Sequence, residues 1–237
     1  MKRMFLVPVL AAGLLAPLGA LAGPFADFES QLRDAYATYR AALFQTNTGK
    51  EDGSAKALAG LARKWDGLSA DWAASPPPQY ADDPAYAETL ANVRASIAAA
   101  ADRVDAGDLP GAHETLEAVR DALGDLHLRN GIVTFSDRMN AYHARMEHVL
   151  TTDYAPMGEA ALGALREEAA VLTYLADDIA AHPAPEADDL DYAPRLAALR
   201  QSVQALQDAA RAGDLEAALA AARGLKKPFS QFFVKFG

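Results

Sequence analysis

The 237-residue sequence contains no cysteine. It therefore has neither a disulfide framework nor the thioether attachment of a c-type haem. Catalytic motifs are missing too. The sequence has no Gly-x-Ser-x-Gly, no phosphate-cradling Gly-rich loop, no His-Glu-x-x-His and no paired Glu-x-x-His ligands of a di-iron bundle. These absences favour a binding or carrier protein over an enzyme.

Long apolar runs are missing beyond the first residues. Two cationic residues precede an apolar run from Met4 to Leu18, which is too short and too interrupted by proline and glycine to span a membrane. Ala20-Leu21-Ala22 has the small-x-small pattern that signal peptidase accepts. We therefore expect residues 1–22 to be a signal peptide cleaved after Ala22, and the mature chain to be periplasmic with no membrane span.

Basic residues are scarce relative to acidic ones. The chain has 22 Lys and Arg against 32 Asp and Glu, a net charge of −10, which argues against nucleic acid as a partner. Cationic partners, including metal ions, remain open, as does a periplasmic redox or membrane-protein partner. Hydrophobic residues make up 51% of the chain, alanine dominates and β-branched residues are few. This composition favours closely packed helices.

The sequence repeats itself. Ala106-Gly107-Asp108-Leu109 recurs 106 positions later as Ala212-Gly213-Asp214-Leu215. The same offset relates Asp82-Asp83, Tyr86, Arg94 and Gly131 to Asp188-Asp189, Tyr192, Arg200 and Gly237, and a one-residue adjustment places Phe28 on Phe135 and Leu32 on Met139. A repeat of this length indicates two copies of one unit, residues 24–131 and 132–237.

Each unit shows the pattern of four helices. In the first unit, apolar side chains recur every three or four residues in four segments, separated by residues 47–54, the proline-rich residues 75–78 and Gly107. Asp82 or Asp83 is expected to cap the third helix. The second unit predicts helices near 132–151, 157–181, 191–212 and 214–235, the last kinked at Pro228. The predicted fold is all-α, with two tandem up-down-up-down four-helix bundles.

The segment from Gly107 to His127 resembles the last helix of the cytochrome b562 family, with a Gly-x-x-x-x-Ala start and a histidine near the end. The proline-rich loop and the Ala-Gly-Asp-Leu link are similar to that family's layout as well. The resemblance implies a periplasmic four-helix bundle that holds haem b between a methionine on its first helix and a histidine on its last.

Neither unit keeps both of these ligands. In the first unit His127 matches the family histidine, but Leu32 stands at the methionine position; in the second, Met139 matches the methionine and Phe233 replaces the histidine. Two arrangements stay open under the resemblance. One is a five-coordinate haem on His127, and the other is a cofactor shared by His127 and Met139.

A second candidate site lies in the second unit. Met139, His143 and Met146 are spaced i, i+4 and i+7, so they share one face of a helix. Two thioethers and an imidazole favour copper, Cu(I) in particular. The alternative is that both methionines fill the core, because they continue the apolar stripe of Phe135 and Tyr142. His113, His148 and His182 are expected on the surface.

Three functions remain after these arguments. The first is a carrier that binds haem b or a metal ion, with copper favoured if the cargo is not haem, for electron transfer or metal handling. The second is a metal-free helical interaction or chaperone module that has lost the haem ligands. The third, and the least favoured, is an enzyme that uses the bound metal.

Overall fold

The computed structural model describes residues 23–158 and 160–237, and every regular element in those residues is a helix. The predicted all-α class is therefore confirmed. The predicted signal peptide, residues 1–22, lies outside the described residues. Among the described helices, none combines the length and the apolar character that crossing a bilayer requires.

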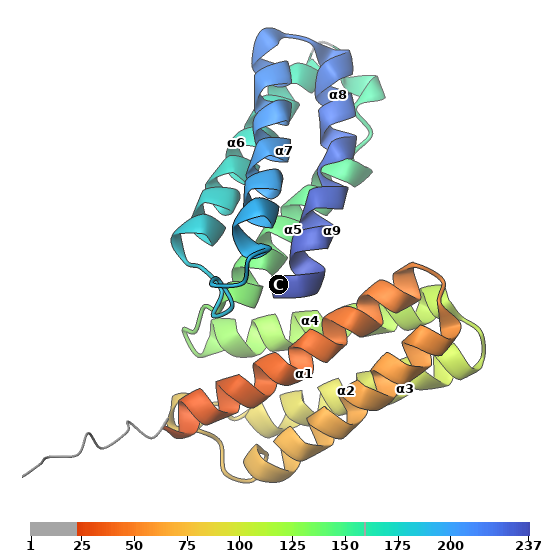
Figure 1. Ribbon diagram of the computed structural model, residues 1–237, viewed down its shortest axis with the longest axis vertical. Helices are drawn as coiled ribbons and strands as arrows, with labels where there is room; N and C mark the ends of the chain where they lie inside the picture. Colours follow the sequence, from red (N-terminus) through yellow and green to blue (C-terminus); the bar gives the residue numbers. More distant parts are fainter. Residues whose placement is uncertain (1–22, 159) are drawn as a thin grey trace, which may run out of the picture.

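The first bundle contains α1 (Pro24–Asn47), α2 (Glu51–Trp72), α3 (Tyr86–Asp105) and α4 (Leu109–Arg129), with a short 3-10 helix, η1 (Pro78–Tyr80), between α2 and α3. Each helix packs on the next along the chain, and α4 returns to α1 (Figure 1). The apolar stripes meet in a buried core around Trp65, whose indole Nε1 donates to the carbonyl of Leu90 at 3.0 Å. This bond ties α2 to α3.

The second bundle contains α5 (Phe135–Thr151), α6 (Ala160–Ala181), α7 (Tyr192–Ala212), α8 (Leu215–Gly224) and α9 (Lys226–Phe236), with a short 3-10 helix, η2 (Ala155–Met157), before α6. The predicted last helix is interrupted, as the proline indicated. Pro228 has no N–H for the carbonyl of Gly224, so the helical hydrogen-bond ladder breaks between α8 and α9.

The repeated Ala-Gly-Asp-Leu motif forms the same turn in both units. Gly107 and Gly213 have φ of 77° and 79°, in the left-handed region that favours glycine. The aspartate that follows each glycine caps the next helix. Asp108 accepts from the N–H of Gly111, and Asp214 from that of Ala217, at 2.9 Å each. One local sequence therefore ends one helix and begins the next in both units.

The predicted cap of the third helix is wrong. α3 begins at Tyr86, and its N-cap residue is Ala85, which makes no side-chain cap. Asp83 accepts from the N–H of Ala85, just before the helix, at 2.9 Å, and from Arg129 and Asn130 at the end of α4 at 2.9 Å each. The side chain of Asp83 is 4% exposed. Its carboxylate ties the end of α4 to the loop before α3.

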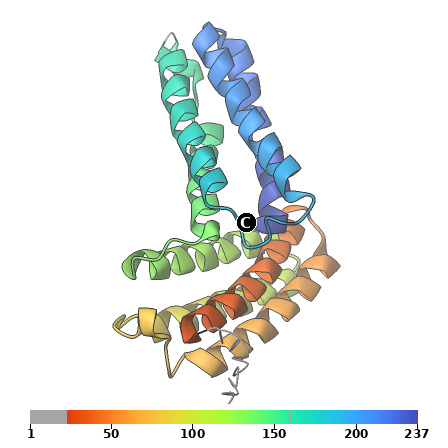
Figure 2. The same ribbon diagram turned by 60° about the vertical axis from the view of Figure 1, so that its left-hand side comes forward.

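The second bundle stands across the first, so that the molecule is L-shaped (Figures 1 and 2). The two meet where α9 packs on α1. Arg40 of α1, only 8% exposed, donates to the carbonyls of Val234 at 3.4 Å, Lys235 at 3.1 Å and Gly237. The last carbonyls of a helix have no partners within the helix and carry its negative dipole end. The guanidinium of Arg40 donates to these carbonyls and places a positive charge at the negative end of the dipole. It thereby fixes the contact between the bundles.

We predict that Arg40→Met loosens this contact while keeping the apolar stem. Hydrogen bonds to a charged group contribute about 1.5–3 kcal/mol each, so we expect a loss of roughly 2–3 kcal/mol of unfolding free energy in urea and a larger radius of gyration by X-ray scattering. Arg94→Met is the matched control, because Arg94 is 66% exposed and pairs only with Asp66 at the surface. If the two variants lose the same unfolding free energy and have the same radius of gyration, Arg40 does not hold the bundles together.

Candidate ligand sites at the junction of the bundles

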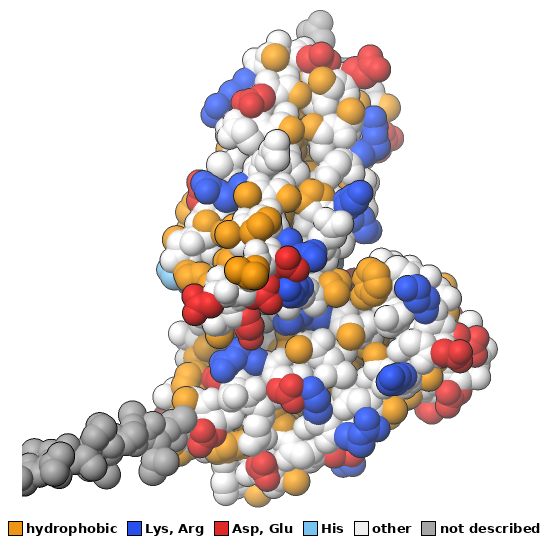
Figure 3. Space-filling view, viewed as in Figure 1, with side chains coloured by type: hydrophobic (Ala, Val, Ile, Leu, Met, Phe, Trp, Pro, Cys, Tyr) orange, Lys and Arg blue, Asp and Glu red, His pale blue; other side chains and the backbone are white. Residues whose placement is uncertain are grey.

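The sequence-predicted ligands His127, Met139, His143 and Met146 lie on α4 and α5, beside the junction of the bundles. Charged side chains of both signs gather at the waist between the two bundles (Figure 3). Two hollows lie there. One is a groove that includes His127, and the other is a smaller pocket that includes His143 and Met146. The four predicted ligands therefore do not share one cavity.

His127 is held in one orientation. It is 5% exposed, and its Nδ1 lies 2.8 and 3.0 Å from the carboxylate oxygens of Asp137. Because a carboxylate only accepts hydrogen bonds, Nδ1 must donate. The other ring nitrogen, Nε2, is buried and has no hydrogen-bond partner within residues 23–158 and 160–237. A histidine oriented by a carboxylate, with its second nitrogen unused, is the usual arrangement of a metal-ligating imidazole.

Asp137 is itself fixed by the start of α5. Its carboxylate accepts from the N–H and the hydroxyl of Thr134, both at 2.7 Å, and Thr134 accepts from the N–H of Asp137 at 3.3 Å, forming a capping box. Burial alone would raise the pKa of Asp137, but hydrogen bonds and charge from His127, with those from Thr134, outweigh it, and the pKa lies below its ordinary value. The carboxylate therefore stays charged beside His127.

The groove beside His127 has a volume of about 790 Å³. It runs between α1, the end of α4, the start of α5 and the loop between α6 and α7, and its lining includes Leu32, Arg33 and Arg138. Glu29 also lines the groove. Burial raises the pKa of Glu29 although His127 lies nearby, and its carboxylate accepts from the hydroxyl of Tyr80 at 3.0 Å.

Haem b, implied by the resemblance, fits only in part. Nε2 of His127 offers one axial ligand, but Leu32 has no lone pair to offer a second. In the second unit the space is filled by aromatic rings. Met139 is fully buried, and Phe233 at the histidine position stacks on Phe229 with ring centroids 5.5 Å apart. The cofactor shared by His127 and Met139 lacks support, because Met139 does not line the groove.

The three predicted copper ligands, Met139, His143 and Met146, do not line one cavity together. Met139 and Met146 are fully buried, and only Met146 lines the pocket with His143. Nδ1 of His143 lies 3.0 Å from the guanidinium of Arg120 and must accept from it, so the neutral ring carries its proton on Nε2. Burial, together with the charge of Arg120, lowers the pKa of His143 to about 4. Neither ring nitrogen presents a free lone pair.

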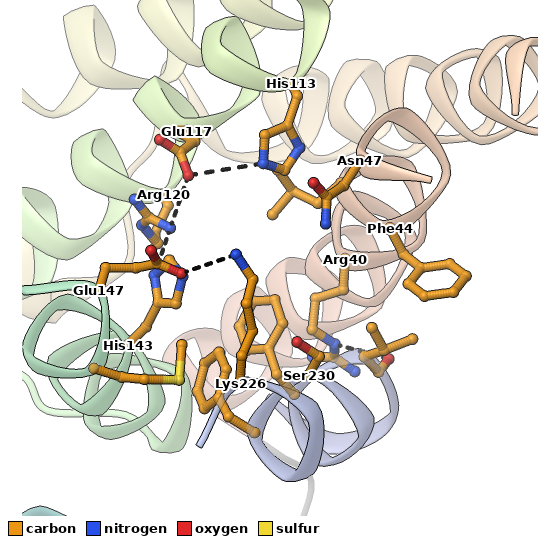
Figure 4. Close-up of a pocket in the computed structure, with 15 residues that line it drawn as sticks. Arg40, Phe44, Asn47, His113, Glu117, Arg120, His143, Glu147, Lys226 and Ser230 are labelled. Atoms are coloured by element: carbon orange, nitrogen blue, oxygen red, sulfur yellow. Dashed lines mark hydrogen bonds and ion pairs between the residues drawn. The ribbon is translucent and has the colours of Figure 1, made fainter. Parts of the chain in front are cut away.

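The pocket has a volume of about 330 Å³ and lies between α1, α4, α5 and α9. Figure 4 shows His113, Glu117, Glu147 and Lys226 pointing into it from three helices. The surface position expected for His113 is therefore corrected, because its ring lies at the junction, 30% exposed. Within the described residues, no three His, Asp or Glu side chains are placed to hold a metal ion.

The sequence did carry a signal for this pocket. His-x-x-x-Glu occurs twice within helices, at His113 and Glu117 on α4 and at His143 and Glu147 on α5, and this spacing places both side chains of each pair on one helix face. Arg120 and Lys226 could not be singled out beforehand. They look like ordinary surface cations until the bundles dock, which is what makes them pocket residues.

We predict that Asp137→Asn lowers stability in a pH-dependent way. A carboxylate with a depressed pKa contributes stability that is present above its unfolded value, near 3.8, and is lost as pH falls through the folded value. The difference between wild type and variant should be about 1–2 kcal/mol at pH 7 and should shrink below pH 4 in urea denaturation series. A difference that stays constant down to pH 2 would contradict a charged Asp137.

Comparison with known proteins adds no relative. No family model matches the chain, and neither a curated protein nor a solved structure matches it. The likeness to the cytochrome b562 family therefore rests on the residues quoted for it.

Proposed function

We propose that the protein is a non-enzymatic periplasmic carrier that binds haem b at the junction of its bundles, with His127 as the one protein ligand to iron. The observation that carries this proposal is the buried Nε2 of His127, which has no partner in the described part of the chain while Nδ1 donates to Asp137. An unpaired buried nitrogen costs free energy. A ligand on Nε2 would remove that cost.

Counting ligands favours haem over a bare ion. A metal ion bound only by the protein needs three or four side chains, and no group of three His, Asp or Glu side chains is assembled in the described residues. Haem brings four nitrogen ligands in its ring and needs only one from the protein. A single well-oriented histidine is what the junction provides.

The groove has features that suit a porphyrin. The groove lies beside His127, and Arg33 and Arg138 in its lining offer cations to the haem carboxylates. Its volume of about 790 Å³ holds only part of a haem, so the rest of the ring would extend into solvent. Bound haem would supply one-electron redox chemistry at its iron. The protein's share is to orient the imidazole through Asp137 and to hold the ring.

The predicted copper site has weaker support. Arg120 occupies Nδ1 of His143, and its guanidinium, together with the ammonium of Lys226 in the same pocket, would repel a cation. The metal-free interaction module is the second proposal kept from the sequence. The spectrum of the purified protein separates it from the haem carrier.

Adding haemin to purified protein should produce a Soret band with a one-to-one endpoint. His127→Ala should abolish that band, because it removes the only ligand. His143→Ala is the matched control, and it should titrate like wild type, since His143 lies in the other cavity. Absence of a Soret shift in the wild type, or identical loss in both variants, would leave the interaction module as the function.

Leu32→Met should restore the missing ligand type. Leu32 stands at the position of the family methionine and lines the groove with His127. If haem binds between α1 and α4 as the resemblance implies, a thioether at this position should turn a five-coordinate, high-spin spectrum into a six-coordinate, low-spin one. Leu123→Met, also in the groove lining, is the control and should leave the spin state unchanged. An unchanged spectrum in Leu32→Met would mean that haem does not bind between these helices.

A further inference from the structure

The pocket between the bundles holds charges that are gathered but not bonded to one another. The contacts of Glu117 are 3.9 Å to His113 and 3.6 Å to Arg120. Glu147 lies 3.6 Å from His143 and 3.3 Å from Lys226. Among these six side chains, one direct hydrogen bond is formed, from Arg120 to His143. Most of their donors and acceptors face the hollow (Figure 4).

Several ion pairs elsewhere in the described residues are tightly bonded, although others, such as Arg195 with Asp191 at 3.6 Å, are as long as those in the pocket. Lys235 donates to Asp189 at 2.8 Å and to Asp191 at 2.9 Å. Arg129 donates to Asp83 at 2.9 Å. These are the distances of charge-assisted hydrogen bonds that hold structure together. The longer gaps around the pocket are what a site keeps for a ligand's own polar groups.

One side of the pocket presents hydrogen-bond acceptors, and another side presents hydrogen-bond donors. The hydroxyl of Thr46 donates to main-chain carbonyls, so it must accept from Nδ1 of His113 at 3.2 Å. In the neutral tautomer, Nε2 of His113 then presents a lone pair toward the carboxylate of Glu117, 3.9 Å away. Two acceptors facing each other call for a donor between them, and an ammonium group meets that need.

The donors are the guanidinium of Arg120, the ammonium of Lys226 and Nε2–H of the neutral His143. A purely cationic ligand would be repelled by the first two. A purely anionic one would be repelled by Glu117 and Glu147. A ligand that carries both signs meets a partner for each, as electrostatic complementarity requires.

The volume of the pocket and its apolar wall further restrict which ligands can bind. Liquid water occupies about 30 Å³ per molecule, so a pocket of about 330 Å³ has room for a ligand of roughly ten non-hydrogen atoms. Phe44, Met146 and Phe233 contribute apolar surface to its wall. Haem is several times larger and cannot be its occupant.

From this arrangement we infer that the pocket between α1, α4, α5 and α9 binds a small zwitterion, an α-amino acid with an apolar side chain. Its ammonium lies against His113 and Glu117, its carboxylate against Arg120 and Lys226, and its side chain against the apolar wall. The pocket does not include His127, so this inference does not depend on haem binding.

Calorimetric titration of the full mature chain with L-leucine and L-phenylalanine tests this inference. N-acetyl-L-leucine lacks the ammonium and L-leucinamide lacks the carboxylate, so each should bind at least about tenfold more weakly than leucine. Equal binding of all three leucine compounds would overturn the assignment. So would no binding of any amino acid at millimolar concentration, or uptake of Zn²⁺ or Cu²⁺ alone.

Two variants assign the ends of the ligand. Lys226→Gln should weaken leucine about tenfold and leave leucinamide unchanged, whereas Glu117→Gln should weaken leucine and leave N-acetyl-leucine unchanged. Lys64→Gln is the matched control, since Lys64 pairs with Asp34 on the surface and does not line the pocket. Thermal melts check that all variants fold. If Lys226→Gln binds leucine with the same affinity as Lys64→Gln, the proposed orientation of the ligand is wrong.

Discussion

The burial of Arg40 against the open carbonyls of α9 is the contact on which both cavities depend. A buried guanidinium without partners is strongly destabilising, and three of the acceptors of Arg40 are main-chain carbonyls of the second bundle. Asp137 makes the complementary link from the start of α5 to His127 on α4. With these two contacts the second bundle has one position on the first, and the groove and the pocket exist only in that position.

The sequence repeat explains why the junction is lined on both sides by similar helices. Each unit presents its first and last helices to the other, as in a symmetric dimer where like surfaces meet. Arg120 and Lys226 are 106 positions apart and are counterparts in the repeat, and both face the pocket. With the one-residue adjustment, the counterpart of Arg40 is Glu147. The reversal of charge at that pair gives the pocket a second carboxylate, in addition to that of Glu117.

The local structure could be predicted from the sequence, and the sites only in part. Apolar periodicity, Gly107, Gly213 and Pro228 placed the helices and the break between α8 and α9, because each acts within one or two turns of chain. Asp83 was misassigned as the cap of α3 because it accepts from the N–H of Ala85, before the helix, and its other partners, Arg129 and Asn130, lie more than forty residues away. The pairing of His127 with Asp137 and of Arg120 with His143 depends on how α4 and α5 are set across the junction, which periodicity does not encode.

The two cavities differ in how strongly their side chains are already held, and this difference assigns them different tasks. The ring of His127 is fixed through its hydrogen bond to Asp137, so a ligand there would meet a preorganised nitrogen and would exchange slowly if the groove must open. The charges around the pocket are loosely paired and face a hollow, so a small ligand can replace water at little structural cost. Because both cavities need the bundles docked, each ligand would stabilise that docked state by mass action. The two ligands would then favour each other's binding without sharing a single contact.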